Sequence, residues 1–468
     1  MDGAETDLEG GLTGWIERVI GGTVVRIQRI PRWRPAWDVD VERDGQLLAL
    51  HARGDRETNF AIPYRIAEEL PTHHLLEAAG LPVPHAYGIC DDPYVLVMDR
   101  LPGLVDLTFA DSDRQRDQLI EEYLALLPRI YGIDLGEAAR AGFDCPTGAR
   151  EIALGSFTKF ERVYDAVMPQ RDPVAEFLRR WLHRNYPRDR IRPAFITYDA
   201  FQFMFADGHI TGLLDFELAH VGDPLMDLAS LRIRDTIKNL GDLAAIAGRF
   251  ADVTGVVVDH DVVDYYAVLY NACTVLSAAP PLAAPMPSTD VVSHMAWYVN
   301  SARWAFELIA DIAGFALEPV NPPTRRRTGH QPAFDHLADG TRRLVQASSG
   351  DYELSSLHRL ARHLVRVQES GADVAAANLD DLATVLAARP APDQADTALL
   401  AFIDAAGPEH DQELVRLLDR RMQRAHLLMA SEGSLMLRHP RLRSLRPGAG
   451  DGPADEDRWP AGAIPGTG

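Results

Sequence analysis

The 468-residue sequence predicts an α+β fold in two lobes, a small strand-rich lobe followed by a larger helical one. Residues 1–100 contain short runs in which apolar and polar residues alternate, as in Trp37-Asp38-Val39-Asp40-Val41, and alternation is typical of half-buried strands. Residues 101–320 instead carry apolar residues three or four positions apart, as amphipathic helices do. The same helical spacing returns in residues 333–446, which predicts a third, all-helical part.

Composition narrows the class of protein. Hydrophobic residues make up 46% and charged residues 25%, which is typical of a globular protein. The net charge of −21 argues against a general nucleic-acid binder, whose surface is basic. No run of about 18 apolar residues and no apolar leader is present, so we expect no membrane span and a cytoplasmic location. The three cysteines form no CxxC pair, which argues against a zinc site or a disulfide framework.

In the first lobe we expect strands near residues 21–27, 37–41, 47–53 and 94–98, the first three forming an antiparallel meander. A helix is expected over residues 66–80, ended by Gly80, and Pro71 within it predicts a kink or a late start. In the second lobe, helical spacing predicts helices near residues 119–127, 174–182, 261–276 and 291–312, and another begins at Asp227.

A Pro-rich linker at residues 318–329 separates the second lobe from residues 333–446. Leucines recur there at helical spacing and no chemical motif is present, so we predict a helical accessory domain for packing or homo-oligomerisation. Residues 447–468 are rich in Gly, Pro, Ala and Asp, and we predict that this tail is disordered.

The stretch most informative about chemistry is 195–217. Two apolar runs, residues 195–205 and 210–214, flank an Asp-Gly turn, which predicts a β-hairpin. Asp199 and Gln202 lie near its start, and Asp215 and Glu217 follow its end, so the hairpin would bring them together. Carboxylate and amide oxygens suit Mg²⁺ bound to phosphates.

This stretch resembles the aminoglycoside phosphotransferases and their kinase-like relatives. Residues 215–229 read Asp-Phe-Glu-Leu-Ala-His-Val-Gly-Asp-Pro-Leu-Met-Asp-Leu-Ala, close to that family's metal-binding segment. Thr197-Tyr198-Asp199 stands where the family has His-Gly-Asp, and Gln202 follows closer to the Asp than the family's Asn does. The order of strands, helix and Pro-Val-Pro in the first lobe is also similar, so the resemblance covers about residues 15–315. It implies a two-lobed protein-kinase-like fold.

The resemblance also implies an activity, an ATP- or GTP-dependent and Mg²⁺-dependent O-phosphotransferase acting on the hydroxyl of a small molecule. Asp199 would accept or orient the proton of that hydroxyl. Asp215 would hold Mg²⁺, Gln202 would supply a second oxygen, and Glu217 would join the metal shell or orient the substrate. The implied partners are the nucleotide and the small substrate, with neither nucleic acid nor membrane.

For the nucleotide, the resemblance places Arg53 where the family has the strand lysine that grips phosphates, with Glu69 as its partner. His51 is the alternative cation. The backbone of Val97, Met98 and Asp99 would contact the adenine ring. The arginine-rich segment 29–35 either covers the phosphates or is a solvated basic loop.

One alternative function stays open. It is a pseudokinase that binds nucleotide or acts as a scaffold without turnover; Thr197 and Gln202 favour it, while Asp199, Asp215 and Glu217 oppose it.

Two further aspartates follow in the same stretch, and we interpret both as structural. Asp223 would stabilise a turn before Pro224, and Asp227 would cap a helix start.

Overall fold

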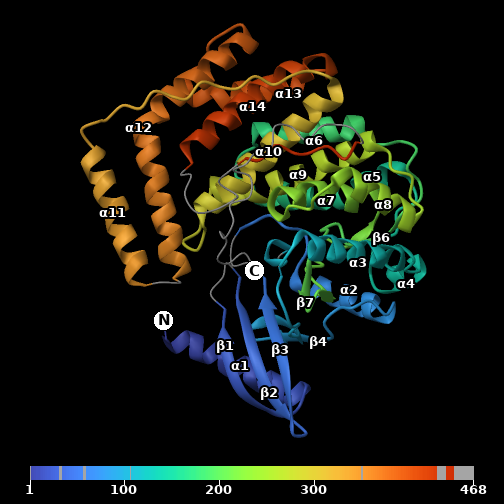
Figure 1. The fold of residues 1–468 in the computed structure, drawn as a ribbon. Helices are drawn as coiled ribbons and strands as arrows, with labels where there is room; N and C mark the ends of the chain where they lie inside the picture. Colours follow the sequence, from blue (N-terminus) through green and yellow to red (C-terminus); the bar gives the residue numbers. More distant parts are fainter. Residues whose placement is uncertain are drawn as a thin grey trace.

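The computed structural model describes residues 2–30, 34–55, 59–105, 107–348, 351–429 and 439–446. The first lobe is built on a five-stranded antiparallel sheet of order β1-β2-β3-β5-β4 (Figure 1). Its strands are β1 (Thr23–Arg29), β2 (Ala36–Arg43), β3 (Gln46–Gly54), β4 (Ala86–Asp91) and β5 (Tyr94–Asp99). The predicted sheet-rich first lobe is confirmed.

Each face of this sheet is covered by one helix. The helix α1 (Asp2–Val19), which the sequence analysis missed, packs Leu12, Trp15 and Ile16 into a core with Trp37. The helix α2 (Ile66–Ala78) begins where expected and contains Pro71; its Ile66 packs on the opposite face. Side chains alternate between faces along a strand, so one face is apolar against α1, while the other carries both the apolar contacts to α2 and the polar side chain of Arg53.

The second lobe is helical, as predicted, and follows the short helix η1 (Leu107–Phe109). Its helices are α3 (Asp113–Tyr131), α4 (Leu135–Arg140), α5 (Ala149–Val167), α6 (Pro173–Asn185), α7 (Leu225–Lys238), α8 (Leu243–Thr254), α9 (His260–Ala283) and α10 (Val291–Ala313). By length and composition α9 could cross a membrane, but 83% of its apolar window is buried inside the protein. Its apolar side chains therefore pack inside the core of this lobe.

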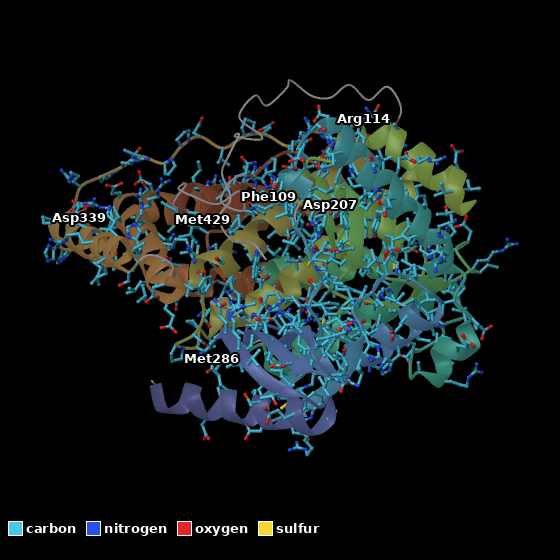
Figure 2. All side chains as sticks on the ribbon, turned by 60° about the horizontal axis from the view of Figure 1, so that its bottom comes forward. Phe109, Arg114, Asp207, Met286, Asp339 and Met429 are labelled. Carbon is cyan, nitrogen blue, oxygen red and sulfur yellow. The ribbon has the colours of Figure 1, made fainter. Side chains whose placement is uncertain are left out.

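Two short strand pairs carry the central stretch. β6 (Ala194–Ile196) pairs with β9 (His220–Gly222), and β7 (Phe203–Ala206) pairs with β8 (His209–Leu213). Asp207 and Gly208 form the turn between β7 and β8 with φ of 51° and 80°, and Asp207 is labelled in Figure 2. Positive φ at both turn residues is what an Asp-Gly hairpin turn provides, so the predicted hairpin is confirmed.

The C-terminal helices are α11 (Gln331–Ala347), α12 (Tyr352–Leu386), η2 (Pro392–Gln394), α13 (Ala395–Ala405), η3 (Pro408–His410) and α14 (Asp411–Leu428). The helical prediction is confirmed. The α11–α12 hairpin projects from the second lobe, with Asp339 of α11 at the outer edge (Figures 1 and 2).

The predicted boundaries of the accessory domain, 333–446, stay a prediction, but its expected independence does not fit the packing. Leu414 and Leu418 of α14 are buried in the same core as the second lobe. Trp304 of α10 also donates its indole N–H to the carbonyl of Pro440 at 2.8 Å. The linker composition could not show these contacts. The tail 447–468 lies outside the described residues.

Candidate active site

The two strand pairs bring three of the predicted site residues into contact. The Gln202 amide donates to Asp199 Oδ2 at 3.1 Å and approaches Asp215 Oδ2 at 3.5 Å. The backbone of Leu214 also donates to the Gln202 carbonyl at 2.9 Å, which fixes the two ends of the hairpin together. The expectation that these groups meet is therefore correct for Asp199, Gln202 and Asp215, whereas Glu217 pairs with Arg34. Their catalytic roles stay predictions.

The backbone around these groups is strained. Tyr198, Phe201 and Asp215 have φ of 56°, 59° and 61°, in the left-handed region that residues with a Cβ seldom adopt. Each such residue costs on the order of 1 kcal/mol or more and persists only where its surroundings hold it. The Tyr198 ring is held edge-on by His220 and Tyr270, at centroid distances of 5.3 and 5.4 Å. Strain of this kind concentrates at functional sites.

One face of α7 holds the strained loop. Asp227, Ser230, Arg234 and Lys238 follow one another at three- and four-residue spacing, so they line one side of the helix. Ser230 Oγ accepts from the backbone N–H of Ala200 at 3.1 Å, and Lys238 Nζ donates to the Phe201 carbonyl at 2.7 Å. This polar stripe in an otherwise buried helix is visible in the sequence as four polar residues at helical spacing, but we did not predict its role from that pattern.

The predicted role of Asp227 as the cap of a helix is wrong. Asp227 does not cap α7; its Oδ1 accepts the backbone N–H of Tyr198 at 2.6 Å, and its Oδ2 accepts from the Tyr131 hydroxyl at 3.0 Å. Burial raises the pKa of Asp227 to about 7. Asp223 does stabilise the expected turn, accepting from the backbone N–H of Leu225 at 3.0 Å.

Asp199 is buried, with 6% of its surface exposed, and it is held by a cation. Arg234 donates through Nε to Oδ1 at 2.7 Å and through Nη2 to Oδ2 at 2.5 Å. The Tyr270 hydroxyl lies 3.3 Å from Oδ1. Burial raises the pKa of Asp199, and the Arg234 guanidinium opposes this rise. Arg234 and Tyr270 come from distant helices, so no local motif pointed to them.

Arg53 joins the two lobes. Its guanidinium pairs with Glu69 on α2, as predicted, and its Nη1 lies 3.2 Å from Asp215 Oδ1. The side chains of Arg53 and Glu69 are only 12% and 2% exposed, so this is a buried pair. The alternative cation, His51, instead contacts Asp38 on β2, with Nδ1 2.9 Å from Oδ1.

Glu217 has a partner of its own. Arg34 Nη2 lies 2.9 Å from Glu217 Oε2, and the Arg34 side chain is buried. The interpretation of segment 29–35 as a solvated loop is therefore wrong for Arg34. Residues 31–33 of that segment lie outside the described residues.

The three predicted nucleotide contacts lie on β5, which pairs with a strand on each side. Val97 and Met98 are buried inside the sheet, between β3 and β4. The Asp99 backbone N–H, expected to face a base, already donates to the His85 carbonyl at 2.9 Å. This N–H is thus already paired, and the contact of the β5 backbone with a base stays a prediction. The alternation pattern located the strand but not its end.

The donor set fits Mg²⁺ only in part. Among the described residues, no three His, Cys, Asp or Glu side chains are grouped to hold a metal by themselves. A magnesium ion that arrives with phosphates needs only one or two protein carboxylates, and Asp215 and Glu217 can supply them. Gln202 fits less well, because its Oε1 accepts from Lys238 at 3.3 Å and its NH₂ faces the carboxylates.

Comparison with known families agrees with this geometry. Residues 63–260, which include Glu69, Asp199 and Asp215, match the model described as "Phosphotransferase enzyme family". These 198 residues are therefore similar to that family. The match confirms the resemblance stated above and supports an enzyme of the phosphotransferase class.

Curated relatives match over a similar part of the chain. Acyl-CoA dehydrogenase family member 11 of Homo sapiens is 25% identical over 178 residues, which is 36% of this chain and 22% of that protein. The Gallus gallus protein of the same name is 28% identical over 182 residues, again 36% and 22%. The chain thus spans 22% of the length of these relatives.

Solved phosphotransferases are also similar. A putative aminoglycoside phosphotransferase from Ralstonia eutropha JMP134 aligns with a TM-score of 0.48 and 15% identity, over 65% of this chain and 98% of that one. Macrolide 2′-phosphotransferase MphH from Brachybacterium faecium aligns with a TM-score of 0.40 and 17% identity, over 59% of this chain and 98% of that one.

Proposed function

We propose that this chain is an ATP- or GTP-dependent O-phosphotransferase that acts, with Mg²⁺, on the hydroxyl of a small molecule. The observation that carries the proposal is one continuous line of polar contacts, Glu69–Arg53–Asp215–Gln202–Asp199, which runs from the sheet lobe to the helical lobe. Along this line, Arg53 would bind phosphates, Asp215 would bind a metal ion, and Asp199 would accept the proton of the substrate hydroxyl.

Phosphoryl transfer asks a protein mainly to position the reactants and to neutralise charge. Asp199 would orient the acceptor hydroxyl and take its proton, while Arg234 keeps the carboxylate in place. Arg53 would turn from Asp215 to phosphate oxygens, and Glu69 would keep holding it. Mg²⁺, when bound, supplies further positive charge between Asp215 and the phosphates.

The acceptor is tested by a turnover screen with ATP or GTP and Mg²⁺ over aminoglycosides, amino alcohols, sugars and hydroxyacyl-CoA thioesters. The last class is included because the relatives carry acyl-CoA in their names. Phosphorylation of one class, lost without Mg²⁺, supports the proposal. Tight nucleotide binding with no transfer to any class contradicts it.

A specific observation favours the pseudokinase as a second candidate. The three carboxylates predicted to serve as base or metal ligand already face a guanidinium: Asp199 faces Arg234, Asp215 faces Arg53 and Glu217 faces Arg34. In a nucleotide-binding scaffold these pairs would persist. In the enzyme, Mg²⁺ and phosphates would displace Arg53 and Arg34, so the ion pairs should open when Mg-nucleotide binds.

A cytoplasmic location and a homo-oligomer through the C-terminal helices remain proposals. Leu337 and Leu344 lie seven residues apart on α11 and are 48% and 53% exposed, and Leu357 on α12 is 53% exposed. Light scattering after size exclusion tests the oligomer. A mass that falls to one chain in Leu337→Gln/Leu344→Gln supports it, and a single-chain mass in the wild type contradicts it.

A further inference from the structure

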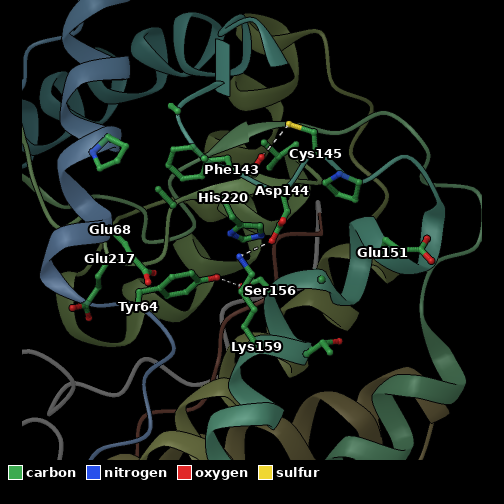
Figure 3. A pocket seen from close by; sticks show the side chains of 18 of the residues that line it. Tyr64, Glu68, Phe143, Asp144, Cys145, Glu151, Ser156, Lys159, Glu217 and His220 are labelled. Atoms are coloured by element: carbon green, nitrogen blue, oxygen red, sulfur yellow. Dashed lines mark hydrogen bonds and ion pairs between the residues drawn. The ribbon is translucent and has the colours of Figure 1, made fainter. Parts of the chain in front are cut away.

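A cavity of about 830 Å³ lies beside the predicted site, and Glu69 and Glu217 form part of its wall (Figure 3). Five carboxylates and three cations line it, so its charge favours no single class of ligand. No residue of α7 is among its lining residues. The helix that supports the strained loop instead contacts a C-terminal segment, residues 439–446, which we call the C-terminal strap.

Two residues of α7 bind the strap. Arg443 donates through Nε to Asp235 Oδ2 at 2.9 Å and through Nη2 to Oδ1 at 2.5 Å. Arg232 of α7 donates in the other direction, through Nε to the Arg443 carbonyl at 2.7 Å. The Asp235 side chain is 1% exposed, so the carboxylate of this pair is buried. Because two parallel bonds between a guanidinium and a carboxylate fix direction as well as distance, Arg443 sets the orientation of this side of α7.

The strap is itself anchored in the second lobe. Leu442 and Leu445 are 9% and 2% exposed and belong to the core of that lobe. His439 Nε2 lies 2.8 Å from Glu307 Oε1 on α10. Arg443 therefore reaches Asp235 from a fixed position, and the strap resists a movement of α7.

The side of α7 that binds the strap differs from the side that holds the loop. Each residue turns a helix by about 100°, so the two strap-binding residues lie outside the polar stripe described above. Asp235 directly follows Arg234, which holds Asp199. Asp235 also ends the helix, because its carbonyl accepts the Asn239 N–H at 3.3 Å and its Oδ1 accepts the Leu240 N–H at 2.9 Å. A rotation of α7, or fraying of its end, would therefore displace Arg234 from Asp199.

We propose that Arg443 is a positioning residue of the site. Through Asp235 it fixes the rotation and the end of α7, and α7 in turn holds residues 198–202 in the strained conformation that orients Asp199. This coupling between the strap and the loop is a property of the folded chain and needs no reaction. Its effect on phosphoryl transfer rests on the proposed function.

Amide hydrogen exchange on the full chain without nucleotide measures this coupling. The reporters are the N–H groups of Tyr198 and Ala200, which donate to Asp227 and Ser230 of α7. In Arg443→Gln we expect both amides to exchange about tenfold faster, while the amides of β2 and β3 in the first lobe keep their rates. Arg443→Lys keeps the charge but not the two parallel bonds, so it should restore part of the protection.

Two further variants serve as controls. The double variant Arg443→Gln/Asp235→Asn removes the charge from both sides of the pair, so it should keep the chain folded and still show fast exchange at Tyr198 and Ala200. Arg441 is also on the strap, but it is exposed, and its charge opposes the rise that burial causes in the pKa of Asp311 on α10. Arg441→Gln should therefore leave both amides at the wild-type rate.

Wild-type exchange rates at both amides in Arg443→Gln and in the double variant, or equal acceleration throughout the double variant, would overturn the proposal. Transfer gives a separate readout. Where the wild type phosphorylates an acceptor, Arg443→Gln should lower the single-turnover rate about ten- to a hundredfold and leave nucleotide affinity unchanged. Faster exchange in Arg443→Gln with no transfer in the wild type would refute the proposed function alone. Unchanged exchange with transfer in the wild type would refute the positioning role alone.

Discussion

Tyr198 shows how single residues shape this site. It lies in the left-handed region, and its ring is packed between His220 and Tyr270. Its hydroxyl is buried and makes no hydrogen bond with any described residue. The packed ring, rather than the hydroxyl, therefore stabilises the loop before Asp199.

Tyr198→Phe should accordingly leave the free energy of unfolding within about 1 kcal/mol of the wild type, or raise it, because an unsatisfied buried hydroxyl is removed. Urea denaturation measures this. A clear loss of stability would show that the Tyr198 hydroxyl does form a stabilising hydrogen bond.

Arg53→Ala should act on binding and stability together. It removes the cation that we propose binds phosphates, and it leaves the Glu69 carboxylate buried without its partner, which costs about 3–5 kcal/mol. Calorimetric nucleotide binding and urea denaturation report the two effects.

The double variant Arg53→Ala/Glu69→Gln separates them. The neutral amide should restore much of the stability and none of the nucleotide affinity. Wild-type affinity in either variant would reject Arg53 as the phosphate cation.

At the scale of elements, α7 supports the strained loop before Asp199 through Asp227, which accepts the backbone N–H of Tyr198. Because burial raises the pKa of Asp227 to about 7, the native state binds a proton that the unfolded chain loses near pH 4. The unfolded state thus holds fewer protons between these values, and the contribution to stability falls as pH rises through this window.

Asp227→Asn should remove this pH dependence, because the amide can keep a hydrogen bond to the Tyr198 N–H and does not titrate. The difference in unfolding free energy between wild type and variant should change by up to about 1.4 kcal/mol per pH unit between about pH 4 and 7. Parallel stability curves would show that Asp227 does not titrate there.

Strong local patterns predicted the elements well. The alternation around Trp37 and the Asp-Gly turn at Asp207 gave correct strands and a correct hairpin. The helix α1 was missed because glycines such as Gly11 argue against a helix, whereas packing of Trp15 under the sheet overrides that preference. Gly11 is needed there, since a Cβ would lie 2.4 Å from the Asp92 carbonyl oxygen.

The site was predicted only where its residues are close in sequence. Asp199, Gln202 and Asp215 flank one hairpin, so their meeting followed from the turn. Arg34 and Arg234 reach the site from residues 183 and 35 positions away from their partners, and no periodicity encodes such long-range ion pairs.

At the scale of the whole molecule, the C-terminal helices complete the core of the second lobe. A chain that ends at residue 319 would uncover Trp304 and the surface beneath Leu414 and Leu418, and each large apolar side chain exposed costs about 1.5–3 kcal/mol. We expect a lower melting temperature or loss of a cooperative transition by circular dichroism. A chain that ends at Arg446 is the control. Equal melting temperatures for the two chains would instead support the predicted independent accessory domain.

We propose above that Asp199 serves phosphoryl transfer at a nucleotide site held by Arg53 and Asp215. The most direct measurement is single-turnover transfer from Mg-ATP or Mg-GTP over the hydroxyl panel, beside calorimetric nucleotide binding, for wild type and Asp199→Asn. We predict nearly equal binding and a transfer rate lowered about 10²–10⁴-fold, because the amide cannot take a proton. Nucleotide binding without transfer in the wild type, or equal transfer rates in both proteins, would contradict the account.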